Sequence, residues 1–445
     1  MLDGITTTMD PRPLIPRPPT TSTGSTSAVD SNNKAPLKES VLMFFAAAGC
    51  TICYTSVLSN LVYYSLTMGV ESYLFLNLTI YGPMLPITIA QTIWDGNFDR
   101  EVGSLGAYSF RGLLGFSVSC ICILLMPFAN QLIPLLIVSL FLGLASATLH
   151  GMLKQMASFI YPGCFRLAAA ATAGMQASAA PVLFVSFATG FGRGSSSDGI
   201  RIFYFSIAGL LLFCWGCFRI LISNSTGVSR GMQRQDSMLL MDDEDIIEPI
   251  ISEREVCLES ENNPPILHQA RSQHGELPTW ELWKKTQPAC FIIMITVASS
   301  MSVACWLNRV KSQNPENEAF AQVLFYTRLL GDLVGRPATL HRTPTSISNL
   351  VFPACFRLSF VPVFFLYTTT NIIPKWDIAA IVGIFMFALT SGYLATLVYQ
   401  LAPSLLNDRE RERNLTRQTG LINVCFSVSI LLGFGLTFAI GSIIE

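Results

Sequence analysis

Long apolar stretches recur along the chain, and short polar segments separate most of them. A helix needs about 20 apolar residues to cross the hydrocarbon core of a bilayer. Eleven stretches reach about this length, namely 38–65, 72–94, 106–127, 129–157, 165–192, 201–222, 286–308, 319–340, 345–368, 377–402 and 416–443. They lack the alternation of barrel strands, and a bilayer-spanning backbone must satisfy its own hydrogen bonds. The pattern predicts an all-α membrane protein with eleven transmembrane helices.

Two long polar segments interrupt this pattern. Residues 1–37 are rich in Pro, Thr and Ser and contain no apolar core of a signal peptide, so we expect a disordered cytoplasmic tail. Residues 223–284 hold an acidic cluster and few aromatic residues, so we expect a disordered cytoplasmic loop. This loop divides a six-helix bundle, 38–222, from a five-helix bundle, 285–445. Such a 6+5 plan is major-facilitator-like, and these folds bind their solute at the midplane between two halves.

The composition agrees with a membrane location. Of the 445 residues, 51% are hydrophobic and 13% are charged, whereas a soluble domain carries about 25% charged residues. The net charge of −1 provides no bulk attraction for a nucleic acid. These values exclude a nucleic-acid binder, an ordinary cytosolic enzyme and a disordered protein, and they make the lipid bilayer the expected surroundings of the chain.

The distribution of Lys and Arg predicts the orientation. Most of these residues lie in the N-terminal tail, in the central loop and in the short segments on the same side as both. Because cytoplasmic segments are enriched in Lys and Arg, we expect a cytoplasmic N-terminus. Eleven spans then place the C-terminus outside, and the plasma membrane is the expected location.

The sequence contains no sign of catalytic or cofactor chemistry. The 12 cysteines mostly lie inside apolar stretches without a cluster of His or Asp beside them, so we interpret them as packing residues and not as metal ligands. The chain has no Gly-x-x-x-x-Gly-Lys phosphate loop, which an ATP-driven carrier would need. We therefore expect a protein that is not an enzyme and that has no catalytic residue, metal or cofactor.

Ionisable side chains within the apolar stretches are candidates for a solute path, because a charge is costly inside a membrane. The stretch 319–340 carries Arg328, Asp332 and Arg336. Their spacing of four residues places them on one face of a helix. The alternative for Arg336 is a position at the cytoplasmic interface, where its head group would reach water.

Two further polar residues lie in early spans. His150 has Lys154 one turn after it, and it either lines the solute path or is a buried histidine that is hydrogen-bonded within the bundle. In the first case we expect His150 to make transport sensitive to pH. Gln176 lies among alanines, and close helix packing explains the alanines but not the glutamine.

Four motifs of the second half lie in order on the predicted helices eight to eleven: Gly331-Asp332-Leu333-Val334-Gly335-Arg336, Arg357-Leu358-Ser359-Phe360-Val361-Pro362, Ser391-Gly392-Tyr393-Leu394-Ala395-Thr396-Leu397 and Thr419-Gly420. The first three are similar to the patterns Asp-x-x-Gly-Arg, Arg-x-x-Phe-x-Pro and Asn-Gly-Tyr-Leu-Ala-Ser-Leu of the equilibrative nucleoside transporter family. The fourth fits the start of the last helix in that family. The eleven-span plan with its long loop after helix six matches over nearly the whole chain.

The resemblance implies a carrier that moves nucleosides or nucleobases by alternating access, driven by the solute gradient or coupled to protons. In that family the Asp and Arg of the eighth helix line the central site, which assigns Asp332 and Arg336 to substrate binding, with the Arg on ribose hydroxyls. Phe325 and Met84 match an aromatic residue and a methionine that line the same pocket in the family.

The residues themselves complete the candidate binding set. Gln176 and His150, which stands where the family has Gln before Gly, provide donors and acceptors for a base edge. Arg328 is an intramembrane cation beyond the family pattern.

Two alternatives stay open. Four basic residues against one acidic residue favour an anionic solute such as a nucleotide: Lys154, His150, Arg328 and Arg336 against Asp332. The other alternative is a channel or receptor on a related bundle. A receptor would have a sizeable outer domain, and a channel would have repeated polar rings, and the sequence indicates neither.

Overall fold

The structure is a computed structural model that describes residues 36–69, 71–160, 165–190, 197–233, 235–237, 277–314, 320–340, 346–370 and 372–444. Within these ranges the chain is almost entirely helical and contains no strand. The predicted all-α class is therefore confirmed. The predicted N-terminal tail lies outside these ranges, except for its last two residues.

The first half of the chain forms the helices α2 (Leu37–Leu58), α3 (Leu61–Met68), α4 (Ser72–Tyr81), α5 (Met84–Val102), α6 (Ser104–Leu125), α7 (Leu132–Phe159), α8 (Phe165–Ala177), α9 (Ala179–Thr189) and α10 (Ser197–Asn224). Three predicted spans of this half are each made of two consecutive helices. The span 38–65 is interrupted at Ser59-Asn60. The span 72–94 is interrupted at Gly82-Pro83, where the proline has no N–H to continue the helix of α4. The span 165–192 is interrupted at Ser178.

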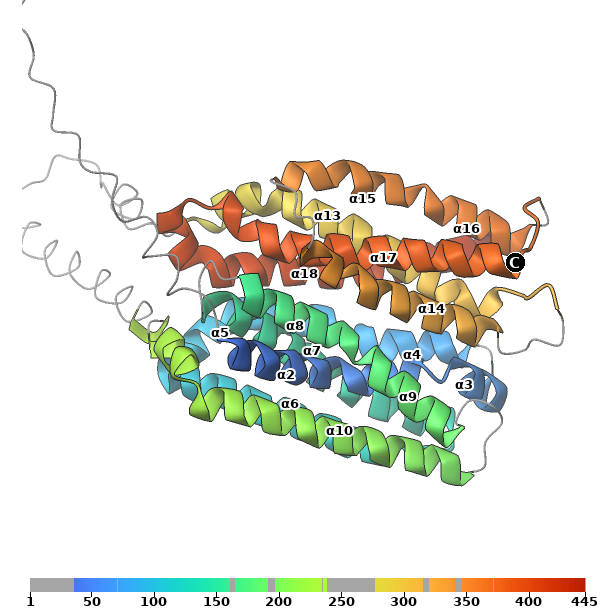
Figure 1. Cartoon of the computed structure of the whole chain (residues 1–445), viewed down its shortest axis with the longest axis horizontal. Helices are drawn as coiled ribbons and strands as arrows, with labels where there is room; N and C mark the ends of the chain where they lie inside the picture. The colour runs from blue at the N-terminus through green and yellow to red at the C-terminus, as the bar shows by residue number, and fades with distance from the viewer. Residues whose placement is uncertain are drawn as a thin grey trace, which may run out of the picture. The chain divides into compact units, whose positions relative to one another are not determined.

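The second half forms α13 (Thr279–Trp306), α14 (Phe320–Gly335), α15 (Val351–Leu358), α16 (Phe360–Thr369), α17 (Asp377–Leu401) and α18 (Asp408–Ile444). Figure 1 shows α13 to α18 side by side as one group and α2 to α10 as another. Within the groups, α13 packs against α18, α14 against α17, and α2 against α8 and α10. Between them, α18 packs against α5 and α7, and α14 and α17 pack against α8.

Ten helical segments in the described part of the chain are long and apolar enough to cross a membrane. The predicted span 319–340 is not among them, because α14 has 16 residues there and carries charged side chains. The helix ends just before Pro337, since proline disfavours helical backbone in the residue before it. The exact count of eleven spans stays a prediction.

The predicted central loop is shorter than 223–284. Residues 226–233 and 235–237 are helical and α13 begins at Thr279, so both ends of the segment are structured. At the first end, the side chains of Val228 and Met232 lie one helical turn apart and are buried. Because the segment is mostly polar, its overall composition does not indicate this helix. The remaining residues, 234 and 238–276, lie outside the described ranges.

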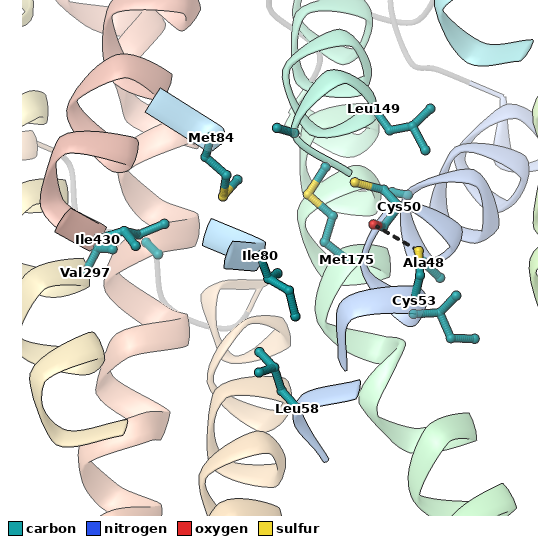
Figure 2. Close-up of a cluster of buried hydrophobic side chains, with 14 of the residues drawn as sticks. Ala48, Cys50, Cys53, Leu58, Ile80, Met84, Leu149, Met175, Val297 and Ile430 are labelled. Atoms are coloured by element: carbon teal, nitrogen blue, oxygen red, sulfur yellow. Dashed lines mark hydrogen bonds between the residues drawn. The ribbon is translucent and has the colours of Figure 1, made fainter. Parts of the chain in front are cut away.

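Buried apolar side chains form one cluster that draws on both groups of helices. Figure 2 shows part of it, in which Ile80 and Met84 of the first group lie near Val297 and Ile430 of the second. Cys50 and Cys53 are fully buried in the same cluster, as expected for packing residues.

The two ends of the helical bundle are named as follows. The loop end is where α10 ends and α13 begins, and where α8 and α18 also begin (Figure 1). The far end is where α2 ends, at Leu58, and where α14 begins, at Phe320.

Candidate functional site

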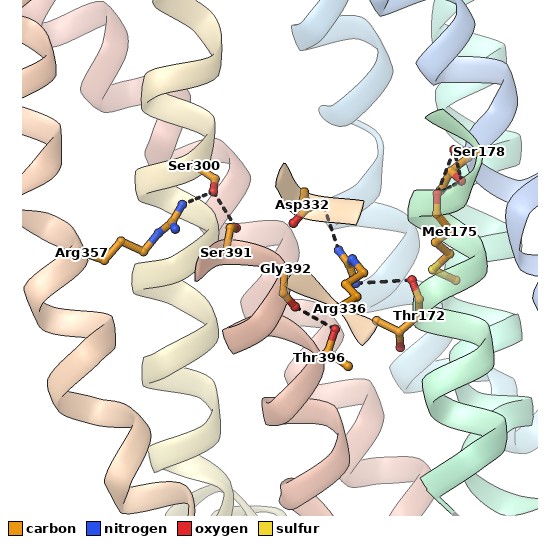
Figure 3. Close-up of polar contacts among 11 residues, drawn as sticks. Thr172, Met175, Ser178, Ser300, Asp332, Arg336, Arg357, Ser391, Gly392 and Thr396 are labelled. Atoms are coloured by element: carbon orange, nitrogen blue, oxygen red, sulfur yellow. Dashed lines mark hydrogen bonds and ion pairs between the residues drawn. The ribbon is translucent and has the colours of Figure 1, made fainter. Parts of the chain in front are cut away.

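Asp332 and Arg336 form an ion pair one turn apart on α14, with Arg336 Nη2 3.3 Å from Asp332 Oδ2. Arg336 Nη1 also donates to the carbonyl oxygen of Thr172, 3.4 Å away on α8. Figure 3 shows this guanidinium lying between α14 and α8. Arg336 Nε is buried and has no hydrogen-bond partner in the described part of the chain. The arginine therefore connects the two groups of helices and retains a donor.

Three glycines explain why Asp332 lies so close to α17. A side-chain carbon added at Gly331 or Gly335 would overlap a backbone carbonyl oxygen of α17, and one added at Gly392 would overlap the carbonyl oxygen of Asp332. The backbones of α14 and α17 can approach only because these positions have no side chain. The glycines of the two motifs thus position the Asp332–Arg336 pair.

Arg357 on α15 is buried and fully engaged. Its guanidinium donates to Ser299 Oγ at 3.0 Å, to Ser300 Oγ at 2.6 Å and to Thr390 Oγ1 at 2.7 Å. Ser300 Oγ lies 2.8 Å from Ser391 Oγ, beside Gly392 (Figure 3). Arg357 therefore joins α15 to α13 and α17, close to the contact of Gly392 with the Asp332 backbone. We interpret Arg357 as a positioning residue. The predicted binding set does not include Arg357, although a charged residue inside an apolar stretch could have indicated that it matters.

A pocket opens at the loop end between α7, α8, α17 and α18, with about 590 Å³ of empty space that is partly continuous with solvent. Most of the wall is apolar. Its lining residues are Lys154, Ala157, Ser158, Ala168, Ala171, Thr172, Tyr399, Ala402, Pro403, Leu415, Gln418, Thr419 and Ile422. Lys154 is the charged member of this lining, which contains no acidic side chain. Thr172, whose carbonyl accepts from Arg336, places the ion pair close to this pocket.

Lys154 is 7% exposed. Its ammonium lies 3.7 Å from the ring centroid of Tyr399 and 4.9 Å from that of Phe426. The Tyr399 hydroxyl donates to Asn423 Oδ1 at 2.9 Å, which fixes the ring. Lys154 has no hydrogen bond or ion pair with any residue that the structure describes, so its charge is balanced by ring faces alone.

His150 is also buried, and its ring stacks on Phe426 with the centroids 5.3 Å apart. Neither ring nitrogen has a hydrogen-bond partner within the described ranges. Gly151 allows the side chain of Gln91 to pack closely against α7, where the Gln91 amide donates to the carbonyl of Thr148 at 3.0 Å. His150 is thus buried, as expected for a core histidine. The hydrogen bond that this interpretation also expects is not found among the described residues.

The other predicted site residues lie elsewhere. Phe325 and Met84 are buried in the apolar cluster, Phe325 toward the far end. Arg328 is half-buried on α14, and Gln176 is half-buried near the end of α8. Neither has a hydrogen bond or ion pair with a described residue. The structure thus joins Asp332 to Arg336 and brings His150 beside Lys154, and it does not gather all seven residues around the loop-end pocket.

The two groups of helices are joined at the far end. Gln322 Nε2 on α14 donates to the carbonyl oxygen of Ser59. The hydroxyls of Tyr326 and Ser186 lie 3.2 Å apart, and the Phe187 ring packs on the Tyr326 ring with the centroids 6.2 Å apart. Contacts therefore close the far end, whereas a pocket separates the helices at the loop end.

Comparison with known proteins identifies the family. No curated protein matches the chain at a significant level. A family model described as nucleoside transporter matches residues 132–442, which is more than half of the chain. The match covers α7 to α18 and with them the ion pair, His150 and the loop-end pocket, and it leaves Met84 outside. Together with the apolar helices, it confirms the resemblance seen in the motifs: the chain belongs to the nucleoside transporter family.

Proposed function

We propose that this membrane nucleoside transporter works by alternating access, with the structure in the state that opens toward the loop end. The observation that carries the proposal is the asymmetry between the ends. Hydrogen bonds and ring contacts join α14 to α9 and to the residue after α2 at the far end, whereas a pocket lies between the groups at the loop end. Rocking of two groups of helices about a site between them would exchange these arrangements.

Asp332 and Arg336 are the proposed centre of the substrate site. Asp332 orients the guanidinium, and the unpaired Nε is available to a ligand. Ribose hydroxyls suit a planar fork of N–H donors, and a neutral solute needs only a few such contacts. We propose that Phe325, Arg328, His150, Gln176 and Met84 line the path as the groups rock. The solute is a nucleoside or nucleobase, moved down its gradient or together with protons.

Uptake measurements test this function. Cells that lack nucleoside transport should gain uptake of labelled adenosine, uridine or hypoxanthine when they express the chain. Coupling to protons would allow a pH gradient to drive accumulation of the solute above its outside concentration. Unlabelled nucleoside loaded inside the cells should accelerate uptake by a carrier. The reason is that a binding site that carries nucleoside outward returns to the outer side faster than an empty site. Acceleration would be absent for a channel, and absence of uptake for all three solutes would contradict the proposal.

We also propose a cytoplasmic N-terminus, a cytoplasmic loop end, an extracellular C-terminus and a plasma-membrane location. A tag at the N-terminus or within 238–276 should be reached by antibody only after permeabilisation, whereas a C-terminal tag should be reached on intact cells. An inaccessible C-terminal tag on a protein at the cell surface would require an even number of spans.

A further inference from the structure

The loop-end pocket holds a buried lysine that has no acidic partner among the residues that the structure describes. Lys154 lines the pocket and is 7% exposed. Its contacts are the faces of Tyr399 and Phe426. Ring faces stabilise an ammonium less than a carboxylate does, because they provide only a partial negative charge. Burial of an ammonium without an anion is unfavourable, so the position favours a ligand that brings one.

Two described acidic side chains, on α14 and on the pocket helix α18, are already paired with other cations. Asp332 on α14 is bound to Arg336. Glu410, near the start of α18, accepts two hydrogen bonds from Lys285 at 2.6 and 2.7 Å. Arg336, whose guanidinium is held by the carbonyl of the pocket residue Thr172, adds a second cation beside the pocket. The electrostatic balance around the pocket is therefore positive.

The remaining wall of the pocket suits the rest of a nucleotide. The lining includes alanines of α7 and α8 and Leu415 and Ile422 of α18, and apolar walls accommodate a base ring.

We propose that the loop-end pocket binds a nucleoside monophosphate, with its phosphate on Lys154 and its base against the apolar wall. The proposal rests on the proposed transport function and adds the phosphorylated form of a nucleoside to the ligands of the carrier. The phosphate contributes the counter-charge that Lys154 lacks, and the ammonium donates up to three hydrogen bonds to the phosphate oxygens.

Binding to the full chain in phosphatidylcholine nanodiscs tests the proposal, since these contain no anionic lipid headgroup. Isothermal titration with adenosine, AMP and inorganic phosphate should give an AMP affinity at least tenfold above that of adenosine. Phosphate alone should bind weakly and should compete with AMP more than with adenosine. Equal affinities for AMP and adenosine would overturn the proposal, and so would phosphate that binds as tightly as AMP.

Variants of Lys154 test the assigned contact. Lys154→Gln should lower the ratio of AMP to adenosine affinity at least tenfold, and Lys154→Arg should retain most of it. The matched control is Lys284→Gln, because Lys284 is exposed and stacks on Trp280 away from the pocket; this variant should keep the ratio. A ratio unchanged in Lys154→Gln would overturn the proposal. Should Lys154→Gln fail to fold, the phosphate competition on the unaltered chain decides instead.

A failure of the proposed transport function can be distinguished from a failure of the phosphate subsite. If adenosine neither binds nor enters cells, transport of nucleosides is contradicted whatever AMP does. If adenosine is transported and AMP binds no better than adenosine, the transport function stands and the phosphate subsite is rejected.

Discussion

At the scale of single residues, Arg336 makes the contact on which the proposed site depends. Its guanidinium holds Asp332 on its own helix and Thr172 on α8, and its Nε remains unpaired in the described structure. A charge-assisted hydrogen bond contributes about 1.5–3 kcal/mol, so loss of even one such bond reduces binding about tenfold or more.

We therefore expect Arg336→Ala to reduce nucleoside uptake at least tenfold while the protein still reaches the membrane. Arg336→Lys should remain poor, because a compact ammonium cannot replace the planar fork between Asp332 and Thr172. Initial uptake rates, normalised to surface-biotinylated protein, measure the effect. Normal uptake by Arg336→Ala would remove the arginine from the substrate site.

His150 leads to a second prediction at this scale. A histidine can gain a proton on acidification, and the His150 imidazole and the Lys154 ammonium both contact the Phe426 ring. Acidification would place a second cation beside Lys154, so uptake of a neutral nucleoside should fall. His150→Gln, which cannot be charged, should remove this fall in uptake on acidification. An identical profile in the variant would make His150 a packed core residue, and a rise on acidification that disappears in His150→Gln would indicate proton coupling.

The sequence predicts some of these residues better than others. The spacing of Asp332 and Arg336 is local, so one helical face could be inferred from it. The environment of Lys154 could not, because Tyr399 and Phe426 lie some 250 residues away along the chain. The same limit applies to Arg357, whose hydrogen-bond acceptors come from α13 and α17.

At the scale of helices, the close approach of α14 to α17 depends on glycines at their contact. A carbon at Gly335 would overlap the carbonyl oxygen of Leu389, and inserted atoms in a well-packed contact cost about 1–3 kcal/mol. Gly335→Ala should therefore lower the melting temperature in detergent and reduce uptake.

Gly216 provides the matched control for this variant. It lies within α10, and no atom outside its own helix lies within 4 Å of where its side chain would begin. Gly216→Ala should leave the melting temperature unchanged or raise it, because alanine favours helix over glycine by about 1 kcal/mol. Equal effects of the two substitutions would mean that helix propensity, and not the α14–α17 contact, decides the result.

The starts of α13 and α18 are joined by Lys285 and Glu410. The hydrogen bonds from Lys285 lower the pKa of the Glu410 carboxyl. A lowered pKa in the folded state stabilises the fold above the unfolded pKa of about 4.3, and this stabilisation is lost as pH falls through the folded pKa. Lys285→Gln should thus lower the melting temperature at pH 7, by an amount that corresponds to about 1 kcal/mol or less for a partly exposed pair. The difference from the unaltered chain should shrink below pH 4, and a difference independent of pH would contradict the assignment.

Helix boundaries were less predictable than helix identity. Apolar length located the long helices, but it could not locate the breaks at Gly82-Pro83 and Ser178 or the helical residues 226–233, which are polar in composition and are held by burial of Val228 and Met232. Hydropathy measures lipid exposure, and these features depend on contacts between helices.

At the scale of the whole molecule, an all-helical membrane carrier follows from length, hydropathy and motifs. The sequence does not predict which end of the bundle is closed, because both states of an alternating-access carrier share one sequence and differ by a few contacts. The far-end contacts of Gln322 and Tyr326 are made by ordinary polar residues near the start of α14. Their partners, the Ser59 carbonyl and the Ser186 hydroxyl, become apparent only in the folded chain.

These contacts should set the balance between the two states. The double variant Gln322→Leu, Tyr326→Phe removes two hydrogen bonds between the groups, each contributing about 0.5–1.5 kcal/mol, and so shifts the equilibrium away from the state open at the loop end. Ser158 lines the pocket, and its hydroxyl donates to the Gln155 carbonyl of its own helix. A reporter cysteine at this position should then react several times more slowly with a membrane-impermeant maleimide applied at the loop end. Thr67→Val is the control, because its exposed hydroxyl bonds within α3 and joins no second group, so it should leave the rate unchanged. Equal labelling rates for the double variant and the parent would mean that the far-end contacts do not hold the pocket open.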